Sequence, residues 1–177
     1  MTDAERAENG AITPVHQWTH DGVRVLLLKC VGADGGSYGG FQWPETGPVI
    51  CPRAAADRAS ASAPSCESGG LFGWPWGIGI GAGKDPEYRE SRWIVFGADP
   101  ADVVLVDGKV KVVGRVEVVF SGPWWLAWTR VLPGAVAWTQ HASSGAASAT
   151  GERGAASATG WSGAASATGG SGAASAT

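Results

Sequence analysis

The sequence predicts a mainly β fold: a small β-rich (α+β) head domain followed by a nonapeptide-repeat β-solenoid. Three observations lead to this prediction. Before residue 135, short runs of valine, leucine and isoleucine are separated by turns rich in Gly, Pro and Asp. Nine of the ten tryptophans lie before residue 139, whereas the tail is nearly all Gly, Ala, Ser and Thr. That tail repeats one hexapeptide four times at a fixed period of nine residues.

These features divide the 177 residues into three segments. We predict that residues 1–14 form a flexible tail, because they lack hydrophobic periodicity and end in a Thr-Pro step. We assign residues 15–134 to the head domain, which is long enough to bury a hydrophobic core. Residues 135–177 are predicted to form the solenoid segment, with disorder as the alternative. Alone it would be frayed, docked on the head domain, stacked against other chains or cut from a longer array, and the last copy stops one residue before the next expected glycine, which favours truncation.

The first part of the head domain predicts strands joined by loops. Residues 23–30 form a continuous run of β-branched residues and leucine between glycine-containing turns, which is typical of a buried strand. Shorter apolar runs predict strands at 49–51 and 93–96. Residues 52–70 are rich in Ala, Ser, Pro and Gly and predict a long surface loop.

A hairpin and a helix are expected in the second part of the head domain. Asp107-Gly108 accepts the backbone angles of a two-residue turn, so the valine-rich runs at 103–106 and 109–113 predict a β-hairpin. Residues 116–120 predict one more strand. After Pro123 the apolar residues follow helical spacing, which predicts one short amphipathic helix that ends at Pro133-Gly134.

Several short motifs of the head domain are similar to those of a known family. They are Ser37-Tyr38-Gly39-Gly40-Phe41-Gln42-Trp43-Pro44, Cys66 followed by a Gly-Leu step, Gly73-Trp74-Pro75-Trp76-Gly77, Trp93 and Gly108-Lys109-Val110-Lys111. With them the chain resembles, over nearly its whole length, an uncharacterised bacterial and phage family that places such a domain ahead of short Gly/Ala/Ser/Thr repeats. The resemblance implies no particular activity. Members often carry Gly-Leu-His after the cysteine, where this chain has Gly70-Leu71-Phe72, so no histidine is present there for chemistry.

Charge and composition exclude several classes of partner. The net charge of −3 is small and not clustered, so we expect no binding to nucleic acid or to a membrane surface. The N-terminus is polar and no run of about 18 apolar residues occurs, so a signal peptide and a transmembrane segment are not expected. A cytoplasmic location is the default. Export by a dedicated machine or with a phage particle leaves no such signal, so a particle-associated or extracellular location stays open.

The glycine-rich segment at residues 77–84 does not fit a phosphate loop. Such a loop needs glycine five residues before the Gly-Lys pair and Ser or Thr after it, where this chain has Ile78 and Asp85. A bent or bulged segment, in which glycines let chains approach, is the interpretation we prefer. No cofactor is predicted.

The residues that could bind a metal lack the usual spacing. Fourteen residues separate Cys51 from Cys66, and Cys30, His16 and His20 stand apart from both, whereas zinc sites usually contain close cysteine pairs. The three cysteines are therefore interpreted as small buried apolar groups in a reducing compartment. Neither a metal site nor a catalytic residue is predicted.

The tryptophans offer a second kind of candidate site. Trp43, Trp74 and Trp76 lie beside prolines in expected loops, where their flat rings could line a groove for sugars or bases. Trp124 and Trp128 share a face with Val131 on the expected helix and are interpreted as core.

Each nine-residue repeat predicts one short strand and one tight corner, so two copies would close one coil of a flattened parallel β-solenoid. Alanines on one face would point inward and leave outward ladders of hydroxyl groups. The ladder residues are Ser148, Thr150, Ser157, Thr159, Ser166, Thr168, Ser175 and Thr177. Trp161 occupies a free repeat position and is expected to be exposed, where a lone aromatic is either incidental or a contact to a partner.

Energetics indicate that four copies are too few to stand alone. A buried methyl group contributes roughly 0.8 kcal/mol, whereas ordering the backbone costs about 1–2 kcal/mol per residue. Ladder hydrogen bonds and further stacked layers must stabilise the array. The low charge of the segment leaves its open edges unprotected, which favours self-association.

Three functions remain open from the sequence. The first is a non-enzymatic structural or adhesive protein that self-associates through stacked Gly-Ala-Ala-Ser-Ala-Thr repeats. The second is a surface-recognition protein that presents Ser/Thr ladders, with ice as one target. The third is an enzyme in the head domain that uses an acidic residue or Cys66 in a tryptophan-lined cleft. The repeats favour the first.

Overall fold

The structure, a computed structural model, describes residues 13–80, 91–106, 109–144, 147–150, 155–158, 165–168 and 173–176. Its contacts divide the chain into two compact units. The first, here called the sheet unit, is Pro14–Val136, and the second includes the chain from Ala137 onward. The flexible tail predicted at residues 1–14 lies almost wholly outside the described residues.

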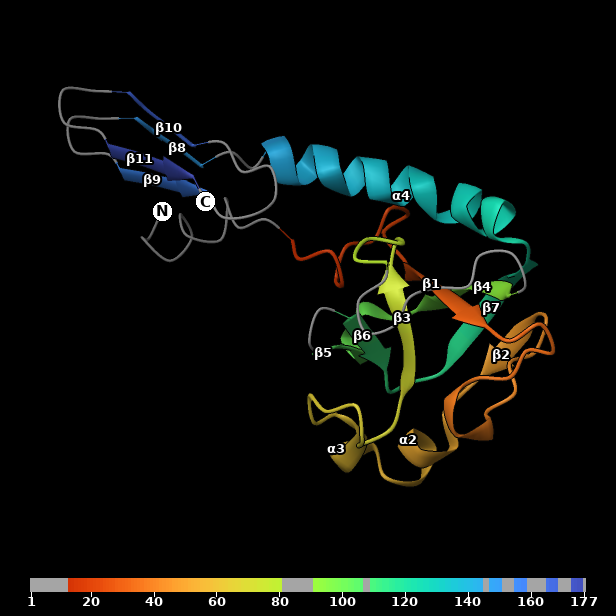
Figure 1. Cartoon of the computed structure of the whole chain (residues 1–177). Helices are drawn as coiled ribbons and strands as arrows, with labels where there is room; N and C mark the ends of the chain where they lie inside the picture. Colours follow the sequence, from red (N-terminus) through yellow and green to blue (C-terminus); the bar gives the residue numbers. More distant parts are fainter. Residues whose placement is uncertain are drawn as a thin grey trace. The chain divides into compact units, whose positions relative to one another are not determined.

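The sheet unit is built on one open, seven-stranded antiparallel sheet with the strand order β2-β7-β4-β1-β3-β6-β5 (Figure 1). The predicted β-rich domain is therefore confirmed. The strands are β1 (Val25–Val31), β2 (Gly47–Val49), β3 (Leu71–Pro75), β4 (Arg92–Ala98), β5 (Val103–Val106), β6 (Lys109–Val112) and β7 (Val116–Gly122).

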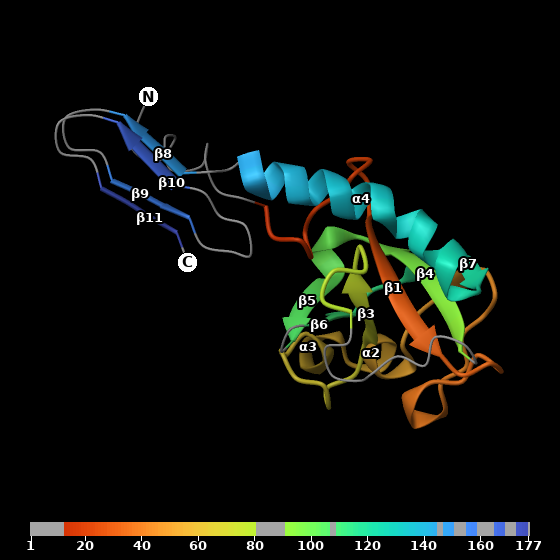
Figure 2. The same ribbon diagram turned by 45° about the horizontal axis from the view of Figure 1, so that its top comes forward.

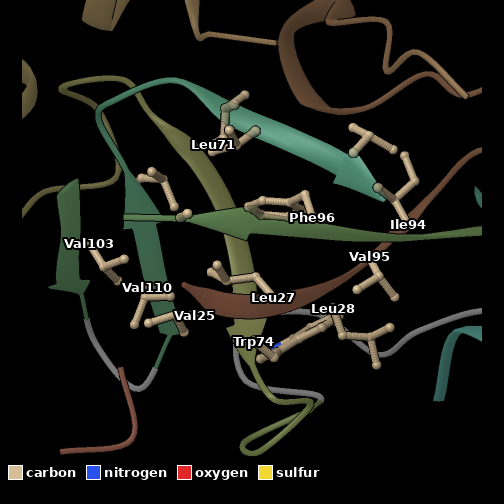
Figure 3. Close-up of a cluster of buried hydrophobic side chains, with 14 of the residues drawn as sticks. Val25, Leu27, Leu28, Leu71, Trp74, Ile94, Val95, Phe96, Val103 and Val110 are labelled. Atoms are coloured by element: carbon tan, nitrogen blue, oxygen red, sulfur yellow. The ribbon is translucent and has the colours of Figure 1, made fainter. Parts of the chain in front are cut away.

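The hydrophobic core surrounds β4, near the middle of the sheet. From Trp93 to Phe96 no residue is more than 1% exposed. Side chains alternate between the two faces of a strand, so this continuous burial means that both faces of the sheet are covered. Leu28 is paired with Trp74 on β3 and with Val95 on β4, which places these three side chains in one layer of the core (Figure 3).

Most strand predictions are confirmed, with shifted ends. The predicted strands at 23–30, 93–96 and 116–120 correspond to β1, β4 and β7. The predicted hairpin is present as the antiparallel pair β5–β6, in which Val106 faces Lys109. The strand expected at 49–51 lies earlier, because β2 ends at Val49. Sequence reasoning missed β3 altogether.

The prediction of a surface loop at 52–70 is wrong for its first half. This segment contains two short helices, α2 (Pro52–Ala56) and α3 (Arg58–Ala61). Proline opens the first, where its missing N–H costs nothing, and the side chain of Asp57 accepts a hydrogen bond from the Ser60 backbone N–H to cap the second. Two further turns are 3₁₀ helices, η1 (Tyr38–Gly40) and η2 (Pro100–Asp102).

Helix α4 (Trp124–Ser144) continues beyond Pro133-Gly134, where the sequence predicted its end. An internal proline costs about 3 kcal/mol because it removes a hydrogen bond and crowds the previous turn. The cost is offset by packing on both sides of Pro133, since Val131 and Ala135 are buried in the core cluster. The predicted short helix is therefore 21 residues long, and it occupies the start of the segment predicted as solenoid. Figure 2 shows α4 as one continuous helix.

Among the described residues of the second unit, the repeats contain four short strands. They pair in parallel as two separate two-stranded sheets, β8 with β10 and β9 with β11 (Figure 2). Ala147 faces Ala165 in one pair and Ala155 faces Ala173 in the other, so both registers join residues 18 positions apart, or two nine-residue copies. The strands are β8 (Ala147–Thr150), β9 (Ala155–Ala158), β10 (Ala165–Thr168) and β11 (Ala173–Ala176).

Candidate functional site: the repeat strands and a buried lysine

The repeat strands bring six of the eight predicted ladder residues into pairs of the same type. Ser148 faces Ser166 and Thr150 faces Thr168 between β8 and β10. The third pair joins β9 to β11 through Ser157 and Ser175. The remaining two, Thr159 and Thr177, lie outside the described residues, as does Trp161.

The backbone alone brings these residues together. In a parallel, in-register pair, each residue lies beside its counterpart on the neighbouring strand, about 4.8 Å away in the hydrogen-bonding direction. Identical sequences 18 residues apart therefore place serine beside serine and threonine beside threonine. Each sheet has two strands, so among the described strands every one of the four has an outer edge without a backbone partner.

The three tryptophans considered for a binding groove are part of the core. Trp43, Trp74 and Trp76 are 4%, 9% and 2% exposed, so they line no open groove. Trp74 lies in β3, whereas Trp43 and Trp76 lie outside the helices and strands, as predicted. Trp43 donates its indole N–H to Ser37 Oγ at 3.2 Å. Trp76 donates to the Trp18 carbonyl at 3.0 Å, which satisfies a polar atom that would be costly to bury alone.

Of the two tryptophans of α4 that were predicted as core residues, only Trp128 packs against the core. Trp124 is 40% exposed, which contradicts the prediction, whereas Trp128 is half-buried and packs against the core.

The glycine-rich segment begins at Gly77, which lies against Trp128. A Cβ added at Gly77 would lie 2.5 Å from Cζ3 of Trp128, and this glycine also has a positive φ of 72°. Glycine at the start of this segment therefore allows the backbone to lie close to the Trp128 ring. The part of that segment beyond Ile80 lies outside the described residues.

The three cysteines occupy different environments. Cys51 is buried, Cys30 is half-buried and Cys66 is exposed, so the interpretation as buried apolar groups is wrong for Cys66. Within the described residues, no three or more His, Cys, Asp or Glu side chains are grouped so that they could hold a metal ion.

Lys111 on β6 is a fully buried charged residue that sequence reasoning missed. Its Nζ donates three hydrogen bonds: to the Ala63 carbonyl at 2.5 Å, to the Ser65 carbonyl at 2.9 Å and to Ser68 Oγ at 2.5 Å. All three donors of the ammonium group are therefore used. The contacts fix the loop that follows α3, here called the anchored loop (residues 63–70).

Glycine and cysteine complete the packing around this lysine. A Cβ added at Gly70 would lie 3.1 Å from both Cβ and Cδ of Lys111, and the φ of Gly70 is +135°, so the anchored loop requires glycine at this position. The backbone N–H of Gly70 donates to Cys51 Sγ at 3.3 Å. Desolvation by burial lowers the pKa of Lys111, and charge on the nearby Cys66 and Cys51 opposes that shift.

This arrangement favours a structural role for Lys111. An amine that acts as a nucleophile needs a free lone pair, whereas here the ammonium group is tied to three neutral acceptors. Its signal in the sequence is weak, since the alternation in Lys109-Val110-Lys111-Val112 is typical of a strand with one solvated face.

No protein-family model matches this chain, and neither the curated proteins nor the solved structures include a significant match. Among the residues that the structure describes, no helix has both the length and the apolar character that membrane crossing requires. The interpretation of function therefore depends on the geometry of the chain itself.

Proposed function

We propose that this chain is a non-enzymatic structural or adhesive repeat protein, and that it self-associates through a parallel β-solenoid formed by its nonapeptide repeats. The single observation that carries the proposal is the register of the repeat strands. Both parallel pairs join residues 18 positions apart, which is the spacing expected when two nine-residue copies form one coil.

Two further observations support a coil of two strands. The strand bounds alternate along the repeats: β8 and β10 begin at the third residue of a copy, whereas β9 and β11 begin at the second. Cα atoms also approach within 8 Å between β8 and β9 and between β10 and β11. Ordinary packed sheets are about 10 Å apart, and the small residues of the repeat allow this closer approach.

Self-association follows from the small number of layers. In the proposed solenoid four strands would make two coils, and among the described strands each outer edge lacks a backbone partner. Natural edges are usually protected by charge or proline, yet Glu152 and Arg153 are the only charged residues from 145 to 177, and that segment has no proline. Pairing with further layers would satisfy the exposed backbone groups.

The test compares the intact chain with a full-length variant in which residues 145–177 are shuffled. The shuffled tail keeps composition, length and charge, so it controls for unspecific association of a low-complexity segment. We expect oligomers or fibres of the wild-type chain in sedimentation and electron microscopy, and their loss in the shuffled variant. A wild-type chain that stays monomeric at all concentrations, or a shuffled chain that assembles equally well, would reject the proposal.

One observation favours a second candidate, a surface-recognition protein that presents hydroxyl ladders. Ser148 faces Ser166 and Thr150 faces Thr168, so like residues are repeated at the strand spacing of a regular sheet. A flat ladder of this kind could match a regular surface such as ice. Thermal hysteresis of the wild-type and shuffled chains, measured at equal concentration, tests this candidate, and equal values for both would reject it.

A further inference from the structure

The repeat strands β8–β11, here called the repeat stack, have two outer edges that differ from each other. In the proposed solenoid, β8 and β9 would form the first layer and β10 and β11 the second. Each strand lies parallel to the one 18 residues before or after it. The outer edge of the first layer and the outer edge of the second layer are therefore different surfaces. Each lacks a backbone partner among the described strands.

From this geometry we infer that copies of the chain stack head to tail, with β10 and β11 of one copy pairing with β8 and β9 of the next. The inference rests on the proposed self-association and adds its polarity and register. The new pairs repeat the ones already present within the chain, so Ser166 of one copy would face Ser148 of the next. The occupant of each edge is thus a second copy of the same chain.

A symmetric dimer would not preserve this match. When two copies of one edge meet about a two-fold axis, the strands run antiparallel. In the centred register of β8 against β8, Ser148 would then face Ala149 of the other copy, and Thr150 would face Ala147. The pairing of like residues seen within the chain would be lost. Head-to-tail stacking retains both the parallel direction and the pairing of like residues.

Head-to-tail contacts do not close on themselves unless the rotation between copies completes a ring. Successive copies in a straight parallel stack are related mainly by translation along the stack. The predicted product is therefore an open filament that grows in length with concentration, rather than a dimer of fixed size. Each added copy would contribute two layers and leave the same pair of edges at the filament ends.

Cysteine cross-linking between different variants tests the polarity. The variants Ser148→Cys and Ser166→Cys are made in a full-length background in which the three native cysteines are replaced by alanine, and circular dichroism checks that each remains folded. Under mild oxidation, a mixture of the two variants should give covalent dimers between copies. Either variant alone should give at least tenfold fewer, because its cysteines would be separated by two strand spacings, roughly 10 Å.

Matched pairs in the second sheet provide the controls. Ser157→Cys mixed with Ser175→Cys should cross-link in the same way, whereas Ser148→Cys mixed with Ser175→Cys joins different sheets and should not. Oligomers in which Ser148→Cys cross-links to itself would overturn the head-to-tail arrangement and leave the proposed self-association intact. A chain that remains monomeric in sedimentation would overturn both.

Discussion

Replacing Gly134 with alanine should destabilise the sheet unit, although alanine is the better helix former by about 1 kcal/mol. The added Cβ would lie 2.0 Å from Cε3 of Trp76, where an ordinary contact begins at 3.4 Å, so helix and indole must separate by 1.4 Å (3.4 minus 2.0). The Trp76 ring is 2% exposed and donates a hydrogen bond to the Trp18 carbonyl, so it has little room to move. Overpacking of this kind costs up to about 3 kcal/mol.

The net loss expected for Gly134→Ala is therefore about 2 kcal/mol, or a decrease in Tm of roughly 5–10 °C. Urea unfolding followed by tryptophan fluorescence measures the free energy of unfolding directly. The exposed position Val136 supplies the control: Val136→Ala improves helix propensity without a clash and should change stability by less than about 0.5 kcal/mol. In a Trp76→Phe background the cost of Gly134→Ala should fall by at least half, because the smaller ring leaves room for the added methyl group. A Gly134→Ala chain as stable as wild type, or an unchanged cost in the Trp76→Phe background, would refute the reasoning.

Three further outcomes are expected in the sheet unit. Burial lowers the pKa of Lys111, so between that pKa and the ordinary value of about 10.5 the unfolded chain binds more protons than the folded chain. The free energy of unfolding should therefore rise with pH through this window. Urea midpoints measured across the window should show the rise, and Lys111→Met should abolish it. Gly114→Ala would place a Cβ 1.5 Å from Asp102 Oδ2 and should cost roughly 1–3 kcal/mol in thermal unfolding. Trp93→Ala should cost about 3–5 kcal/mol, whereas exposed Trp125→Ala should cost less than about 0.5 kcal/mol; similar values for the two would contradict the burial pattern.

The strands that could be predicted from sequence are those whose signal is local. The apolar runs of β1 and β4 and the valine-rich β5–β6 hairpin are continuous and end at turn residues, so the pattern alone identifies them. β3 has no such signal because Gly73 and Pro75 interrupt it. Gly73 is needed there for a tertiary reason: a Cβ would lie 3.0 Å from Cζ of Phe96 on β4. Such a requirement appears only when the strands are packed.

The same distinction explains the misplaced helix end and the missed lysine. Pro133 is a local stop signal, and packing of α4 on the core overrides it. The position of Lys111 in an alternating strand indicates solvent, and only the distant loop that supplies Ala63, Ser65 and Ser68 makes burial of its charge acceptable. For the repeats, the coil of two copies and the outward hydroxyl ladders stay predictions, which the 18-residue register supports.

The register of the repeat strands also sets a rule for changes in repeat number. The strand bounds recur every 18 residues, so two nonapeptides added together supply one new strand to each of the two sheets. A single added nonapeptide supplies a strand to one sheet only and leaves the other sheet one strand short. In the proposed solenoid, length variants of the array should therefore be tolerated in steps of two copies, and odd copy numbers should leave a half-finished layer at one end.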